Sequence, residues 1–380
     1  MFAWLVAIVL FEPPIKVGIA QMALLIPAML FMLIGGVVTD SFGGKRVAMI
    51  SQALAVLPIA ALAIVIFTDS LTFEIMLVYA VSIGILQAFV TPARDSLLNY
   101  VAFGRIQRTV IKATLMQFVA QMLGFTLAAT ADTLGGVFVI TTQAIIVGFG
   151  VLALSQLPNT QSSASLKSGS FLAVMKTSIL EGAQTVWDNR AMRSVVGQNI
   201  AMGICFMGSY IVTIPLLIRE RYEGTSFDLS ILSLFNSSGL VLTIVLLLLF
   251  SRGIRRQGRA LLIAHGVGAF VLGIGGLGIS YWAFCALVFL WGACGGVAMS
   301  MSRTIMQEQA PESQRGRVMA FFSFSFMGSG PIGAMLWGTS AQFFGPETTL
   351  LVANISMFCI VLMISLNSRL WRMKSTFALD

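Results

Sequence analysis

Histidine and cysteine are scarce in this sequence of 380 residues, which contains one histidine and four cysteines. The cysteines stand alone in apolar stretches, without a C-x-x-C pair, so neither a zinc site nor a disulfide framework is expected. Convergent histidine, cysteine and carboxylate groups are also what a polytopic enzyme would need. No G-x-x-x-x-G-K-[ST] run occurs, which argues against a nucleotide partner. The sequence therefore predicts no catalytic residue, no metal, no cofactor and no nucleotide.

Charge is equally scarce, because Asp, Glu, Lys and Arg make up 10% of the residues while hydrophobic residues make up 57%. The mean hydropathy of +0.92 lies far above that of a soluble domain. A helix that crosses the hydrocarbon core needs about 20 apolar residues. We therefore predict an all-α polytopic membrane protein with eleven complete spans. The spans are expected at residues 17–38, 47–67, 75–93, 113–131, 133–157, 194–218, 229–250, 260–280, 281–302, 318–344 and 348–368.

The opening stretch, MFAWLVAIVLF, is apolar but only about half a bilayer long. It ends at Glu12, Pro13 and Pro14 and looks like the outer half of a twelfth helix. A signal peptide is the alternative, but that would carry a basic region before the apolar run and a small-residue cleavage site after it. We expect roughly 15 to 25 further residues upstream of Met1, which would complete the span.

Positive charge exceeds negative charge, with a formal net charge of +8. If the turn that contains Lys45 and Arg46 is cytoplasmic, alternation of the spans places 20 of the 23 lysines and arginines inside. Such an asymmetry is the positive-inside rule, which explains the charge without a nucleic-acid partner. We therefore expect a multi-pass protein of the lipid bilayer whose Lys45/Arg46 turn and 158–193 connection are cytoplasmic.

The longest polar connection, residues 158–193, follows the span that would be the sixth. It divides the chain into an N-terminal helix bundle at 1–157 and a C-terminal helix bundle at 194–368, followed by a cytoplasmic tail at 369–380. Apolar residues recur at helical spacing in the connection, which predicts an amphipathic helix along the membrane surface. These residues are Phe171, Met175, Ile179 and Val186.

Similar patterns recur in the two bundles. Arg94 follows the fourth helix and Arg303 follows the tenth, at a separation of 209 residues. Because each half contains six crossings, both halves enter the membrane in the same orientation, which makes them parallel, pseudo-symmetric repeats. We expect the substrate path to run between the two six-helix bundles.

The turn after the 17–38 span reads GGVVTDSFGGKR, where glycines, one aspartate and two cations follow an uncharged stretch. The pattern G-x-x-x-D-x-x-G-x-K-R resembles motif A of the major facilitator superfamily, with Ser41 and Gly44 where that family usually has arginines. The resemblance implies the major facilitator fold. It also implies a latch that closes the cytoplasmic side when Asp40 binds the start of the eleventh helix. The implied latch residues are Gly36, Asp40, Gly43, Lys45, Arg46, Arg315 and Arg317.

Two further segments, ILEGAQTVWDNRAMRSVV and QEQAPESQRGRVMAFFSFSFMGSGPIGAMLWG, look like the bacterial drug-efflux group that contains macrolide and enterobactin exporters. This resemblance implies a secondary active transporter in the bacterial cytoplasmic membrane. Its substrate would be a small hydrophobic or amphipathic molecule, moved outward by alternating access. TDSFGGKRVAM and TPARDSL are also similar to lysophospholipid transporters. A non-transporting receptor or scaffold can share the same fold, so both alternatives stay open.

Polar side chains within spans are costly in lipid and therefore tend to face the bundle interior. For each of them, an interhelical hydrogen bond or simple packing is the alternative to contact with a small-molecule substrate. The substrate-cavity candidates are Gln87, Arg94, Gln121, Gln198, Asn199, Tyr210, Asn236, Trp291 and Phe324.

Carboxylates are missing from all the complete spans. A proton-coupled carrier generally needs a titratable group that loads and releases a proton. If protons are a partner, the coupling candidates are Asp95 and His265. For His265, a packed neutral imidazole is the alternative.

Overall fold

The structure is a computed structural model that describes residues 2–101, 106–157, 180, 182–250, 254, 256–311 and 315–373. Most of these residues are helical, and none of them forms a strand. Nine of the described helices are long and apolar enough to cross a membrane, and Met116–Ala129 is a shorter apolar helix. The prediction of an all-α polytopic membrane protein is confirmed.

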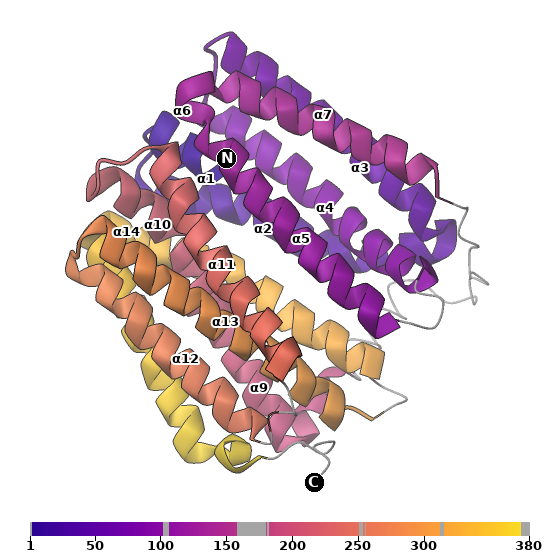
Figure 1. Cartoon of the computed structure of the whole chain (residues 1–380), viewed down its shortest axis with the longest axis vertical. Coiled ribbons are helices and arrows are strands. Elements are labelled where there is room, and N and C mark those ends of the chain that lie inside the picture. Colours follow the sequence, from indigo (N-terminus) through magenta and orange to yellow (C-terminus); the bar gives the residue numbers. More distant parts are fainter. Residues whose placement is uncertain are drawn as a thin grey trace. The chain divides into compact units, whose positions relative to one another are not determined.

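Contacts between Cα atoms divide the chain into two compact units. The first unit contains Met1–Glu12, Ile19–Ser170 and Thr225–Ser230. From its N-terminus to residue 155 the chain forms α1 (Phe2–Trp4), a π-helix η1 (Leu5–Val9), α2 (Pro14–Phe42), α3 (Gly44–Phe67), α4 (Phe73–Val101), α5 (Ile106–Ala129), α6 (Ala131–Leu134) and α7 (Gly136–Ser155). Helices α3 and α7 lie side by side, and α3 also packs against α4 (Figure 1).

The second unit contains Pro13–Gly18, Phe171–Gly224 and Ile231–Asp380. From residue 190 onward the elements are α9 (Arg190–Ala201), a π-helix η2 (Met202–Gly208), α10 (Ser209–Glu220), α11 (Ser226–Phe250), α12 (Gln257–Ile274), a 3₁₀ turn η3 (Gly275–Leu277), α13 (Tyr281–Gln309), α14 (Arg315–Asn367) and a 3₁₀ turn η5 (Arg369–Arg372). Helix α12 packs along both α13 and α14 (Figure 1).

Helix α14 contains two of the predicted spans in succession. The break falls at Gly345, whose φ of 79° and ψ of 161° are not helical. Glycine adopts a positive φ without the steric penalty that a Cβ imposes, and Pro346 then restarts the helix. The predicted boundary between residues 344 and 348 therefore lies at the observed break.

The span Arg190–Glu220 is continuous but not uniform. Its middle, Met202–Gly208, is a π-helix between α9 and α10. Such π-turns are rare and concentrate at functional sites. Cys205 and Phe206 lie within it and are buried in the hydrophobic core of the second unit.

In each unit, glycines allow the backbones of two neighbouring helices to come into direct contact. In the first unit, a Cβ built on Gly35 of α2 would lie 2.3 Å from the Ala88 carbonyl oxygen of α4. In the second unit, a Cβ on Gly292 of α13 would lie 2.1 Å from the Asn236 carbonyl oxygen of α11. Helices α2 and α4 hold the same places in the first half of the chain as α11 and α13 do in the second. The close approach is therefore repeated in the two halves.

Asn189 caps helix α9. Its Oδ1 accepts hydrogen bonds from the backbone N–H groups of Ala191, at 2.9 Å, and Met192, at 3.2 Å. We expect Asn189→Ala to lower the free energy of unfolding by about 1 kcal/mol, because these two N–H groups would lose their acceptor. Thermal unfolding in detergent measures the change. Asn189→Asp keeps the acceptor and serves as the control, and equal loss in both variants would contradict the capping role.

The predicted amphipathic helix lies mostly outside the described residues, because Phe171, Met175 and Ile179 are not described. Val186, the last member of the predicted stripe, is 2% exposed and belongs to the core of the second unit. Its helical segment thus packs against α9 and its neighbours.

Candidate functional site

The turn between α2 and α3 carries the motif that resembles motif A. Gly43 has a φ of 84° and a ψ of 136°, a conformation that a side chain would strain. Gly44 lies against α4, since a Cβ there would be 2.9 Å from the Ala93 carbonyl oxygen. The glycines of this motif therefore have a local structural cause, a tight turn pressed against a neighbouring helix.

Lys45 makes a contact that the sequence reasoning missed. Its Nζ donates a hydrogen bond to the Leu157 carbonyl oxygen, just past the end of α7. A cation there meets the unpaired carbonyls and the negative end of the helix dipole. Lys45, one of the latch candidates, therefore has a contact inside the first unit.

Two of the remaining latch candidates, Gly36 and Arg46, have described surroundings. Gly36 has open space around the position of a Cβ, and the Arg46 side chain is exposed. The side chains of Asp40, Arg315 and Arg317 lie outside the described part of the chain. The latch thus stays a prediction.

The candidates of the first unit are spread over two helices. Gln87 and Arg94 lie on α4 and Gln121 lies on α5, and all three side chains are exposed. Arg94 and its repeat mate Arg303 occupy corresponding positions near the ends of α4 and α13, which are both 29 residues long. The Asp95 side chain falls outside the described part of the structure.

Two of the second unit's candidates form a buried polar pair. The Gln198 amide Nε2 lies 2.6 Å from Nδ1 of His265, and these side chains are 0% and 3% exposed. Because an amide nitrogen can only donate, Nδ1 accepts and the neutral imidazole carries its proton on Nε2. That nitrogen faces the Met202 sulfur at 3.4 Å. This geometry matches the packed-imidazole alternative for His265.

Asn199, the next residue along α9, points to a different helix. Its Nδ2 donates to the Phe322 carbonyl oxygen at 3.0 Å and to Ser325 Oγ at 2.9 Å. Both acceptors lie on α14, next to the candidate Phe324, which is 36% exposed. The Asn199 amide therefore ties α9 to α14 through interhelical hydrogen bonds.

Aromatic rings gather beside the Gln198–His265 pair. Tyr210 and Trp291 stack with ring centroids 4.9 Å apart. Phe206 meets Trp291 edge to face at 5.7 Å and lies 6.0 Å from the His265 ring. We call Phe206, Tyr210, His265 and Trp291 the aromatic cluster. Sequence reasoning missed Phe206, whose only signal is its place one helical turn before Tyr210.

Asn236 lies at the edge of this region. Its backbone packs against Gly292, the residue after Trp291, and its side chain is half-buried. The second unit thus brings Gln198, Tyr210, Asn236 and Trp291 into one region. Asn199 binds Phe322 and Ser325 of α14, which stand on either side of Phe324 in the sequence.

The chemistry of these groups is neutral. They offer aromatic faces, amide donors and amide acceptors, which bind apolar and polarised surfaces. No group of three or more His, Cys, Asp or Glu side chains able to hold a metal occurs among the described residues. Such a surface suits a neutral or weakly cationic amphipath.

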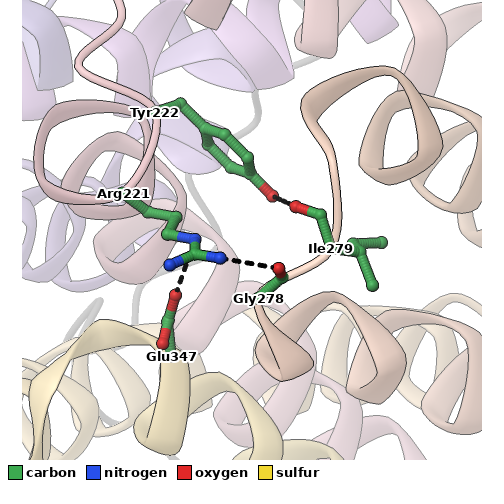
Figure 2. A network of polar contacts seen from close by, with 5 residues as sticks. All are labelled: Arg221, Tyr222, Gly278, Ile279 and Glu347. Carbon is green, nitrogen blue, oxygen red and sulfur yellow. Dashed lines mark hydrogen bonds and ion pairs between the residues drawn. The ribbon is translucent and has the colours of Figure 1, made fainter.

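A polar network holds one end of the second unit together, as Figure 2 shows. Arg221, just past α10, donates from Nη2 to the Gly278 carbonyl oxygen at 2.7 Å, and its Nε lies 3.3 Å from Glu347 Oε1. The Tyr222 hydroxyl donates to the Ile279 carbonyl oxygen at 3.0 Å. The network thereby joins the end of α10, the turn between α12 and α13, and the restart of α14 after Gly345.

Burial raises the pKa of Tyr222 to about 12, against the opposing effect of the Arg221 cation. The raised pKa favours the neutral phenol in the folded protein. Its contribution to stability is therefore complete below the ordinary tyrosine value near pH 10 and is lost as the pH rises toward about 12. The hydrogen bond to Ile279 is independent of pH in the physiological range.

The hydrogen bond of Tyr222 should stabilise the protein more than the neighbouring ion pair. The Arg221 and Glu347 side chains are 49% and 39% exposed, so solvent screens their attraction. We expect Tyr222→Phe to cost about 0.5–1.5 kcal/mol. Glu347→Gln should cost less than about 1 kcal/mol and only at low salt. Thermal unfolding at low and high salt measures both. A larger, salt-dependent loss in Glu347→Gln than in Tyr222→Phe would contradict this ranking.

The family of this protein follows from its similarity to known proteins. The chain matches the family model of the Major Facilitator Superfamily over residues 5–334 and 254–374. The chain belongs to the major facilitator superfamily. The resemblance inferred from the motif A pattern is thereby confirmed, and this superfamily member is a multi-pass membrane transporter.

Relatives and solved structures agree with this assignment. The superfamily member is 27% identical over 357 residues to the multidrug efflux pump Tap of Mycolicibacterium fortuitum, covering 90% of this chain and 85% of that protein. It is similar in structure to the nucleoside transporter NupG, with a TM-score of 0.73, 13% identity, and coverage of 96% and 92%. The xylose transporter XylE from E. coli, in an inward-open conformation, gives a TM-score of 0.67 at 12% identity, with 96% and 87% covered. These likenesses establish the major facilitator fold.

Proposed function

We propose that this protein exports small hydrophobic or amphipathic compounds across the bacterial cytoplasmic membrane by alternating access. The similarity to the multidrug efflux pump Tap along most of the chain carries the proposal. The neutral aromatic and amide groups of the second unit support it, because they suit an uncharged or weakly cationic substrate. The protein works as a transporter and performs no catalysis.

The proposal includes an orientation and a division of the chain. The Lys45/Arg46 turn and the 158–193 connection face the cytoplasm, as the excess of lysine and arginine in these segments favours. The domains are an N-terminal helix bundle at 1–157, the linker at 158–193, a C-terminal bundle at 194–368 and a tail at 369–380. Cysteine substitution in each loop, followed by labelling with a membrane-impermeant maleimide from either side, tests the orientation.

Transport of a fluorescent dye tests the function itself. The purified protein is reconstituted into proteoliposomes, and accumulation or loss of a hydrophobic cation such as ethidium is followed with and without an imposed pH gradient. We expect gradient-dependent dye movement that empty liposomes lack. Movement of a fluorescent lysophospholipid but not of dyes would replace the proposal by a lipid transporter. Binding of either compound without movement would indicate a receptor or scaffold.

The same vesicles test proton coupling. We propose that protons drive export, with Asp95 and His265 as the candidate carriers. His265→Asn keeps a polar side chain but cannot be charged, so gradient-driven transport that survives in this variant assigns the proton to Asp95 or to another group. Transport that is lost in His265→Asn but kept in Asp95→Asn assigns it to His265.

Asp40 is proposed to act in the latch that motif A implies. We expect Asp40→Asn to lower transport while expression stays intact, because removing one charge–dipole contact of about 0.3–2 kcal/mol biases the conformational equilibrium. Dye transport per molecule of reconstituted protein measures the effect. Asp69→Asn, in the exposed turn after α3, is the matched control. Wild-type transport in Asp40→Asn would exclude the latch.

A further inference from the structure

An apolar groove opens on the first unit beside the α2–α3 turn. Its volume is about 470 Å³. Side chains of α2, α3 and α4 line it, and among the described residues Arg46 and Ser51 are the polar ones. The apolar lining consists of Val38, Phe42, Val47, Ile50, Leu54, Ile85, Leu86 and Phe89.

The groove lies on a surface that faces outward along the whole of α3. Ile50 and Leu54, in its wall, are 47% and 48% exposed. Further along the same helix, Leu57, Ile64 and Phe67 are more exposed still. In a membrane-spanning helix, a continuous exposed stripe of large apolar side chains is a surface for lipid chains. The groove is therefore a depression in a lipid-facing surface.

Among the described side chains that line the groove, the charged one lies at one end. Arg46 is the third residue of α3 and lies where this span begins, next to the Gly43 turn. From Arg46 to Leu54 the helix rises about 12 Å. This length approaches one leaflet of hydrocarbon, about 15 Å. The groove is thus apolar along the depth of a leaflet and cationic where lipid phosphates lie.

We propose that this groove binds one phospholipid with an anionic headgroup. Its phosphate lies against the Arg46 guanidinium, and one acyl chain lies between Ile50 and Leu54 of α3 and Phe89 of α4. Arg46 fits this role better than Lys45, because the Lys45 ammonium already donates to the Leu157 carbonyl oxygen. A guanidinium also binds phosphate through two parallel hydrogen bonds. Arg46 is also a latch candidate, but the lipid proposal does not rest on the proposed export function.

The test uses photoreactive lipids and the full-length protein. The protein is reconstituted in nanodiscs of phosphatidylcholine that contain a small fraction of phosphatidylglycerol with a diazirine in its acyl chain. After illumination, mass spectrometry locates the labelled peptides. We expect labelling in the groove segments of α3 and α4, and about fivefold less labelling when the photoreactive lipid is phosphatidylcholine.

Two variants separate the headgroup from the acyl chain. Arg46→Gln should reduce phosphatidylglycerol labelling about fivefold and leave phosphatidylcholine labelling unchanged. Leu54→Trp, which fills the groove, should reduce labelling by both lipids. Arg259→Gln is the matched control, because Arg259 is the third residue of α12 but has its guanidinium 5.0 Å over the Trp371 ring.

Three results would overturn the proposal. The first is equal labelling of the groove by both lipids in the wild type. The second is an equal loss in Arg46→Gln and Arg259→Gln, which would mean that only net charge matters. The third is displacement of the lipid label by excess ethidium, which would make the groove a substrate site. None of these measurements requires transport, so failure of the export proposal would leave the lipid result intact.

Discussion

Gly292→Ala should destabilise the protein by about 1–3 kcal/mol, and Gly292→Leu should prevent folding of the second unit. The added Cβ would lie 2.1 Å from the Asn236 carbonyl oxygen. The contact is reciprocal, since a Cβ on Gly239 would lie 2.0 Å from the Phe289 carbonyl oxygen. Both obstacles are backbone atoms, which no side-chain rotation can move. Helices α11 and α13 would have to separate, and their packing would be lost along their length.

Gly295 provides the control on the same helix. It lies three residues after Gly292, and a Cβ there would have nothing within 4 Å. Gly295→Ala should therefore leave stability unchanged or raise it slightly, because alanine favours the helix. Thermal unfolding in detergent and the fraction of monodisperse protein compare the two variants. If Gly292→Ala melts at the same temperature as Gly295→Ala, the close approach of α11 and α13 is wrong.

Trp291→Ala should reduce dye transport about tenfold if the aromatic cluster contacts the substrate. Its ring stacks on Tyr210 at 4.9 Å and meets Phe206 at 5.7 Å. Loss of an aromatic contact worth about 0.5–1.5 kcal/mol to a ligand, together with loosening of its two neighbours, amounts to about one order of magnitude in affinity. The substrate concentration at half-maximal transport should rise accordingly. Trp291→Phe preserves a ring and should retain most of the activity.

The control for this result is Trp282, nine residues earlier on α13. Trp282 is 65% exposed, and Trp282→Ala removes the same side chain away from the aromatic cluster. Its transport should match the wild type. Equal transport by Trp291→Ala and Trp282→Ala, both folded, would exclude Trp291 from the substrate path without affecting the family assignment.

The spans could be predicted from the sequence because a helix that crosses the hydrocarbon core needs about 20 consecutive apolar residues. The ends of the helices were predicted less accurately where a polar capping residue, and not hydropathy, determines where the helix begins. The span predicted at 194–218 begins at Arg190, because Asn189 caps the helix before hydropathy rises. The predicted break before residue 348 was correct, because a glycine such as Gly345 commonly ends a helix and a proline such as Pro346 commonly begins one.

The site could be predicted only as a set of residue types. An amide side chain within a span predicts a hydrogen bond, but the sequence does not identify the residue that forms it. Gln198 proved to pair with His265, 67 residues away, whereas its neighbour Asn199 pairs with Ser325, 126 residues away. Such pairings depend on which helices become neighbours. Phe206 was missed for another reason, because one phenylalanine among 28 carries no signal until its ring is placed beside Trp291.

The glycine contacts repeated in the two units have a consequence for exchanging segments between related transporters. A carbonyl oxygen on one helix of each pair occupies the space that a side chain would need on the other. A chimera that takes α13 but not α11 from a relative, or α4 but not α2, pairs two helix surfaces from different proteins. A side chain on one of them can then clash with a backbone carbonyl of the other. The two helices of each pair should therefore be exchanged together, with crossover points in the connections outside the pair.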